Sequence, residues 1–232
     1  MKNGLVFFLG VFAALAISFA GIVLGSHAQL GRLAPYFDEN EGQAFPLRTA
    51  GIATRGQYVY ADLGCAACHT QQVRRPDFGS DQARGWGERQ SVARDYIHQP
   101  RPQLGASRLG PDLANLGGRK PTPPTEADLY KLLYEGSPRH PAYQFLFDRR
   151  AVTGEPSPRA VQVEAGRQIV PTERAQSLVA YLLSLNTPYD YPEARPVQPP
   201  AKPAANAPAP EKPAVTPIPA AAPDEKQPLP KK

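Results

Sequence analysis

Methionine, tryptophan, cysteine and histidine are all scarce in this chain. The sequence has one methionine, one tryptophan, two cysteines and four histidines, and the methionine is residue 1. A structural zinc site needs four ligands, and the two cysteines have no second pair at ordinary spacing to complete one. Because no methionine follows residue 1, a thioether ligand to a metal in the folded part of the chain is also excluded.

A large excess of charge is missing as well. Lysine and arginine total 26 and aspartate and glutamate total 21, so the formal net charge is +5. This mild basicity is scattered along the chain and is too weak to indicate nucleic-acid binding. It fits an acidic protein partner or an anionic membrane surface, and we expect no nucleic-acid partner.

Both cysteines fall in one motif, Cys65-Ala66-Ala67-Cys68-His69. Two thiols three residues apart on one turn can each form a thioether to a porphyrin vinyl group, and the adjacent imidazole then becomes the proximal iron ligand. We therefore predict one covalent haem c on Cys65 and Cys68, with His69 bound to the iron. The alternatives are half of a zinc site or a thioredoxin-like redox pair, although such a pair does not need the histidine.

The N-terminal segment is uncharged and mostly apolar from residue 4 to residue 25. As a helix it would span about 33 Å, enough to cross a bilayer core of about 30 Å. We predict a transmembrane anchor over residues 1–28. The alternative is a cleaved signal peptide, since small residues flank His27, but the apolar run is longer than a typical signal sequence. In both cases the rest of the chain is exported.

Composition divides the remaining chain into three parts. Residues 29–50 read as an irregular linker, residues 51–187 as a folded domain, and residues 188–232 as a disordered tail rich in proline, alanine and lysine. Of the 28 prolines, 14 lie between residues 188 and 230. Such a segment cannot bury enough apolar surface to fold.

Three helices are predicted in the folded domain, and the stretches between them read as loops. The first runs from Ile52 into the haem motif. The second is capped by Thr125 and ends at Gly136, and the third is capped by Thr172 and carries an apolar stripe at helical spacing. The expected fold is all-α and similar to class I cytochrome c.

The sequence Gly110-Pro111-Asp112-Leu113 resembles the Gly-Pro-x-Leu loop of class I cytochromes c. The resemblance implies that the Pro111 carbonyl accepts a hydrogen bond from the second ring nitrogen of His69 and so orients it. Gly56, Tyr60 and Tyr181 likewise resemble the family's positions where the first and last helices cross, a packing role.

A closer resemblance is to the membrane-anchored mono-haem subunit, subunit II, of cbb-type cytochrome c oxidases. This resemblance covers roughly residues 5–187. The motifs that carry it are at residues 65–74, 84–87, 91–96, 107–113 and 141–143. It implies that the chain receives electrons from a di-haem cytochrome c subunit or a soluble c-type cytochrome and passes them to the catalytic haem–copper subunit. It also implies a single-pass protein of the bacterial inner membrane with its haem domain on the periplasmic side.

The sequence departs from that family at one position. The family pattern has a distal methionine just before Pro-x-Tyr, whereas this chain has His140 before Pro141-Ala142-Tyr143. We predict His140 as the sixth iron ligand, with His98 as the alternative. Trp86 and Arg108 are candidates for hydrogen bonds to the haem propionates. The alternative is that the Trp86 indole is part of the core and that the Arg108 charge is solvated.

Electron transfer within a terminal oxidase is therefore the leading function, and no catalytic site is expected in this chain. One alternative is a free-standing membrane-anchored cytochrome that carries electrons between other respiratory complexes. A haem-based redox sensor and a free-standing haem enzyme such as a peroxidase are the others. An enzyme would need a second haem or an open distal face with a catalytic acid, and a candidate sixth ligand argues against it.

Overall fold

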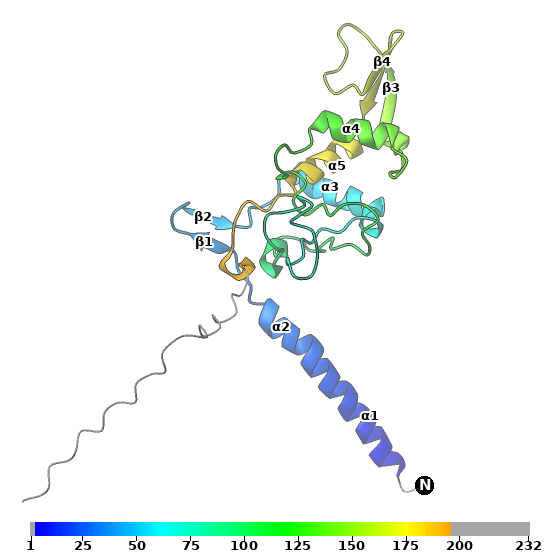
Figure 1. Ribbon diagram of the computed structural model, residues 1–232. Helices are drawn as coiled ribbons and strands as arrows, with labels where there is room; N and C mark the ends of the chain where they lie inside the picture. The colour runs from blue at the N-terminus through cyan, green and yellow to red at the C-terminus, as the bar shows by residue number, and fades with distance from the viewer. Residues whose placement is uncertain (1–2, 196–232) are drawn as a thin grey trace, which may run out of the picture. The chain divides into compact units, whose positions relative to one another are not determined.

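The computed structural model describes residues 3–195. The chain begins with one long helix made of α1 (Gly4–Phe19), a π-helical turn (Ala20–Leu24) and α2 (Gly25–Leu30) (Figure 1). Apolar side chains cover every side of α1 and all are exposed. By length and composition this helix can cross a membrane.

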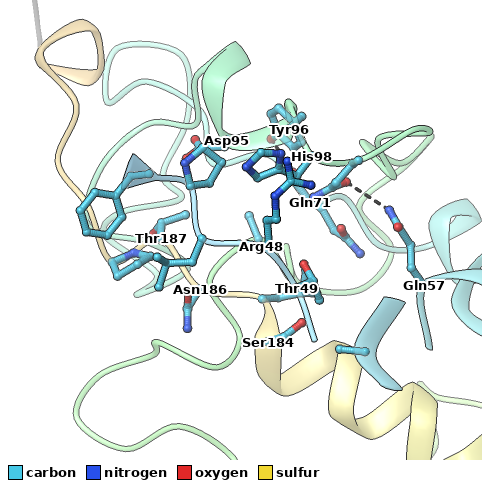
Figure 2. A pocket seen from close by; sticks show the side chains of 18 of the residues that line it. Arg48, Thr49, Gln57, Gln71, Asp95, Tyr96, His98, Ser184, Asn186 and Thr187 are labelled. Atoms are coloured by element: carbon cyan, nitrogen blue, oxygen red, sulfur yellow. Dashed lines mark hydrogen bonds between the residues drawn. The ribbon is translucent and has the colours of Figure 1, made fainter. Parts of the chain in front are cut away.

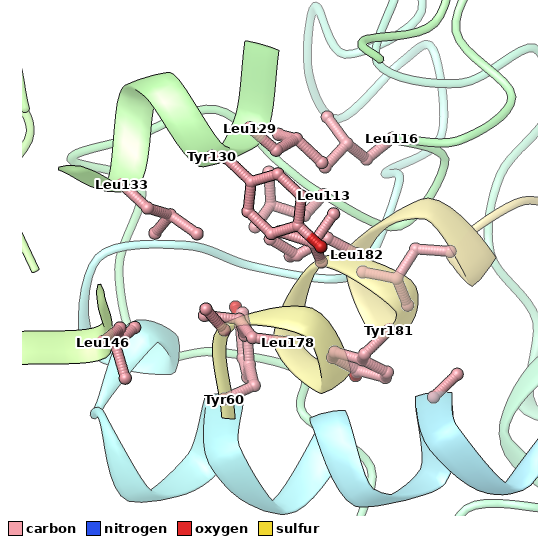
Figure 3. Close-up of a cluster of buried hydrophobic side chains, with 14 residues drawn as sticks. Tyr60, Leu113, Leu116, Leu129, Tyr130, Leu133, Leu146, Leu178, Tyr181 and Leu182 are labelled. Carbon is pink, nitrogen blue, oxygen red and sulfur yellow. The ribbon is translucent and has the colours of Figure 1, made fainter. Parts of the chain in front are cut away.

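The core of the folded domain lies where α3 (Gly51–Asp62) crosses α5 (Glu173–Ser184) (Figure 3). The helices touch at Gly56, where an added Cβ would overlap the carbonyl oxygen of Ser177. Beside this contact the rings of Tyr60 and Tyr181 meet edge to face, with centroids 5.5 Å apart. The predicted crossing of first and last domain helices therefore depends on a residue without a side chain.

Helix α4 (Glu126–Glu135) covers the same core with Leu129, Tyr130 and Leu133. Its predicted start and stop are confirmed, because Thr125 and Asp128 form a capping box and Gly136 ends the helix with φ +71°. The predicted cap of α5 is confirmed too, since the Thr172 hydroxyl accepts a hydrogen bond from the Ala175 amide. Short 3-10 helices occupy Cys65–Ala67, Ala93–Tyr96, Gln144–Leu146 and Pro192–Ala194.

The all-α fold class is wrong, because the chain also forms two small antiparallel sheets. Strands β1 (Tyr36–Asp38) and β2 (Gln43–Phe45) pair in the stretch read as an irregular linker. Strands β3 (Phe147–Ala151), β4 (Gln162–Glu164) and β5 (Arg167–Pro171) form a sheet in the order β3-β5-β4, in the stretch read as a loop between α4 and α5.

Turn chemistry and two buried residues explain the larger sheet. Between β4 and β5 the chain reverses through Ala165 (φ +37°) and Gly166 (φ +78°), the positive-φ pair that suits a two-residue hairpin. Ile169 and Val170 of β5 are buried, and β-branched residues favour strands. Strands of three to five residues are too short for a clear alternating pattern.

The first residues of the predicted tail pack against the β1–β2 hairpin. The ring of Tyr189 stacks on Phe45 with centroids 4.3 Å apart, and its hydroxyl donates to Asp38 at 2.6 Å. Tyr191 is buried in the same small cluster. The segment up to Arg195 therefore belongs to a packed region, and the rest of the predicted tail, residues 196–232, lies outside the described residues.

Candidate haem-binding site

A sharp turn after α3 places the two thiols and His69 together. The turn starts at Gly64, whose φ of +70° is the left-handed conformation that glycine adopts without a Cβ clash. One 3-10 turn follows at Cys65–Ala67, and the His69 amide donates to the Cys65 carbonyl at 3.0 Å. Cys65, Cys68 and His69 thus share a single turn of backbone.

The Cys65 thiol does not have the character of a reactive cysteine. Cys65 is half-buried, and burial raises the pKa of its thiol to about 11, whereas reactive cysteines have lowered values. Residues 3–195 also contain no group of three or more histidine, cysteine, aspartate or glutamate side chains that could hold a metal ion. Both observations weigh against the redox-pair and zinc alternatives and leave the haem interpretation.

Residues 104–113, here called the clamp segment, run alongside the haem motif and bind its backbone. The amides of Ala106 and Gly110 donate to the carbonyls of Ala66 and Cys68 at 2.8 and 2.9 Å. Further along, the Leu113 amide donates to the Thr70 carbonyl at 2.7 Å. The clamp segment therefore holds the motif in place by main-chain hydrogen bonds.

Two neighbours of His69 in the clamp segment fix its ring. The imidazole Nδ1 lies 2.8 Å from the Pro111 carbonyl oxygen, to which its N–H donates. An added Cβ at Gly110 would overlap Cε1 of the same ring. The ring is thus held by one hydrogen bond and one close backbone contact, which leaves Nε2 for a metal.

His140 lies across from His69, with the two ring centroids 6.2 Å apart and the ring planes inclined by 50°. A metal bound by imidazole lies about 2 Å from the nitrogen and so about 3 Å from the ring centre, which puts two rings on opposite sides of one metal roughly 6 Å apart. The observed spacing fits one iron between the two rings. These residues therefore suit a haem ligated by two histidines.

The surroundings of His140 support the same interpretation. Its Nδ1 is buried and has no hydrogen-bond partner among the described residues, a costly state unless a bound group completes it. Burial lowers the pKa of His140, which favours the neutral imidazole that binds metals. The loop is held by a mutual pair of backbone hydrogen bonds between Ser137 and His140 and by the Tyr143 amide on the Leu133 carbonyl.

Trp86 and Arg108 come together, but around a buried carboxylate. Arg108 donates to Asp81 at 2.6 Å and to the Gln72 carbonyl at 2.6 Å, and its guanidinium lies 5.7 Å from the centre of the Trp86 ring. Arg74 also binds Asp81, at 3.0 Å. Burial alone would raise the pKa of Asp81, but the hydrogen bonds from Arg74 and Arg108 outweigh it and lower the pKa to about 2. Contact of Trp86 and Arg108 with haem propionates stays a prediction.

His98 lies in the wall of a different cavity, of about 490 Å³, together with Arg48, Gln57 and Gln71 (Figure 2). Neither His69 nor His140 lines that cavity. The structure thus brings His140, and not His98, to the ring of His69. None of the residues 65–69 of the haem motif lines this cavity.

The sequence interpretation missed two residues that shape this site. Gly105 has φ +88°, and an added Cβ there would overlap the His69 carbonyl oxygen. Asp112 is fully buried and binds the segment that follows His69. The only sequence signal is the Gly-Pro-x-Leu motif, in which Asp112 is the x position and which Gly105 precedes, because both contacts join segments that are far apart in the chain.

A haem motif on one turn, opposed imidazoles and an apolar N-terminal helix define a membrane-anchored c-type cytochrome. Residues 3–174 match the family described as "Cytochrome C oxidase, mono-heme subunit/FixO", and the chain belongs to it. Members of this family are mono-haem cytochrome c subunits of cbb3-type oxidases, so the chain is an electron-transport protein that binds haem c and associates with an oxidase complex and its catalytic subunit. No match to a curated protein was found.

Proposed function

We propose that this chain relays single electrons through one haem c, tethered to Cys65 and Cys68 and ligated by His69 and His140. The observation that carries the proposal is that the imidazole of His140 lies next to that of His69 in the haem motif, with the two ring centroids 6.2 Å apart. When bound, haem supplies a one-electron ferric/ferrous couple. The protein supplies the tether, both axial ligands and the orientation of the proximal ring.

Two axial histidines favour a relay over catalysis. A haem held by both His69 and His140 would leave no position open for oxygen or peroxide, unlike the open distal face of a haem enzyme. Imidazole donates more charge to ferric iron than a thioether does, so this haem has a lower reduction potential than a His/Met cytochrome c. The lower potential favours onward transfer to the catalytic subunit and requires a more reducing donor.

The donor we propose is the di-haem cytochrome c subunit of the oxidase or a soluble c-type cytochrome, and the acceptor is the catalytic haem–copper subunit that reduces oxygen. The apolar helix holds the chain in the bacterial inner membrane, with the haem domain on the periplasmic side. Support comes from the length of that helix and from the chemistry of the motif, because c-type haem is attached outside the cytoplasm.

Acid–acetone extraction tests the tether. We expect haem to stay with the wild-type chain, isolated from the oxidase complex, and to be lost from the Cys65→Ala/Cys68→Ala double variant. Rapid reduction of the complex by the donor then tests the relay: the haem of this chain should be reduced before the catalytic centre. Haem that acid–acetone removes from the wild-type chain would overturn the covalent attachment.

A further inference from the structure

The carboxylate of Asp112 is fully buried and has an unusual set of partners. Its Oδ2 accepts from the Thr70 hydroxyl at 2.5 Å and from the Gln72 amide at 2.8 Å, and its Oδ1 accepts from the Ala114 amide at 2.9 Å. Arg108 stands 3.6 Å from Oδ2. Burying a carboxylate is costly, and these donors and this cation offset the cost.

The position of those partners gives the carboxylate a specific effect. Thr70 is the next residue after His69 and Gln72 is the third, and Asp112 directly follows Pro111. The Pro111 carbonyl and the Asp112 amide belong to one planar peptide unit. Fixing the Asp112 side chain against residues 70–72 therefore fixes the direction of the carbonyl that accepts the Nδ1 proton of His69.

We propose that Asp112 is a positioning residue for the proximal ligand: it aims the Pro111 carbonyl at His69 and thereby sets the basicity of the imidazole and the reduction potential of the haem. This rests on the proposed ligation of the iron by His69. A hydrogen bond to the outer nitrogen of a ligating histidine raises the basicity of the ring and stabilises the ferric state. A weaker bond should therefore raise the potential.

Asp81 provides a matched control for Asp112. It is also a fully buried carboxylate bound to Arg108, but its other hydrogen bonds go to Arg74 and not to the residues beside His69. Asp112→Asn and Asp81→Asn each remove one buried negative charge. Loss of a buried charge and of the stability it provides is thus common to both variants, and the exchange of the His69 proton separates an effect of position from an effect of charge.

The experiment uses the full chain with its haem, purified in detergent and labelled with ¹⁵N at its four histidines. We expect Asp112→Asn to raise the reduction potential more than Asp81→Asn does. The Nδ1 proton of His69, observed in the reduced diamagnetic form, should exchange with solvent faster in Asp112→Asn and at the wild-type rate in Asp81→Asn. Thr70→Val, which removes one donor to the carboxylate, should show a smaller change in the same direction.

Equal potentials in the two aspartate variants, with unchanged exchange of the His69 proton, would show that Asp112 only stabilises the fold and would overturn the proposal. If Asp112→Asn does not fold, Thr70→Val decides by the same two measurements. Failure of the underlying ligation would appear separately, because the wild-type chain would then lack the spectrum of a histidine-ligated haem.

Discussion

The two sides of the haem site are built in opposite ways. On the side of His69, the clamp segment contributes a row of main-chain hydrogen bonds, the Pro111 carbonyl and a buried carboxylate. On the side of His140, the loop between Gly136 and Tyr143 holds the backbone of His140 by hydrogen bonds with Ser137, but the ring nitrogen Nδ1 has no partner among the described residues. The proximal ligand is therefore fixed by the protein itself, and the distal ligand is completed by what it binds.

Gly110→Ala should break the proximal side and have the largest effect. The new methyl group would overlap the His69 ring, and overpacking against a fixed ring costs about 3 kcal/mol. We expect loss of the low-spin spectrum and a clear drop in Tm. Gly51→Ala, where an added Cβ meets nothing within 4 Å, is the control and should change neither. A wild-type spectrum in Gly110→Ala would show that His69 is not held as described.

Gly136→Ala should disturb only the distal side, and by less. Gly136 has φ +71°, and an added Cβ would lie 2.9 Å from the His140 carbonyl oxygen, so we expect a cost of about 1–3 kcal/mol. The haem should stay tethered and keep His69, while part of the population becomes five-coordinate and high-spin. Gly154→Ala shares the positive φ but has open space around it, and should destabilise without changing the spectrum. Identical spectra for the two variants would count against a distal role for the loop.

Acid should destabilise the fold through Asp81. Its pKa is about 2 in the folded chain and 3.8 in the unfolded chain, so the carboxylate stabilises the fold above pH 3.8 and loses that contribution as the pH falls towards 2. We expect a loss of about 2 kcal/mol of unfolding free energy over this range. Denaturant titrations at several pH values should show that the free energy of unfolding depends less steeply on pH in Asp81→Asn than in the exposed control Asp148→Asn. Equal slopes in the two variants would contradict the assignment.

The elements that the sequence predicted well are those defined by neighbouring residues. Thr125 and Thr172 cap helices through bonds that reach three residues along the chain, and the apolar stripe of α5 repeats within that helix. The five residues of the haem motif are contiguous, so its chemistry could be read directly. Such signals are local, and local hydrogen bonds and periodicity are visible in a sequence.

The elements that the sequence did not predict depend on contacts between distant segments. Tyr189 stacks on Phe45 from the far end of the chain, and the strands of the β3-β5-β4 sheet are too short to show a period. The carboxylate of Asp112 gains its role only where it meets Thr70, 42 residues earlier. Residue types alone do not reveal such pairs.

The most direct test of the account is the coordination of the oxidised haem in the full chain. We predict a six-coordinate low-spin spectrum without the near-infrared sulfur-to-iron band, because no methionine follows residue 1. His140→Ala should convert it to a high-spin spectrum, and His98→Ala should leave it unchanged. A six-coordinate spectrum that survives in His140→Ala and disappears in His98→Ala would contradict the account.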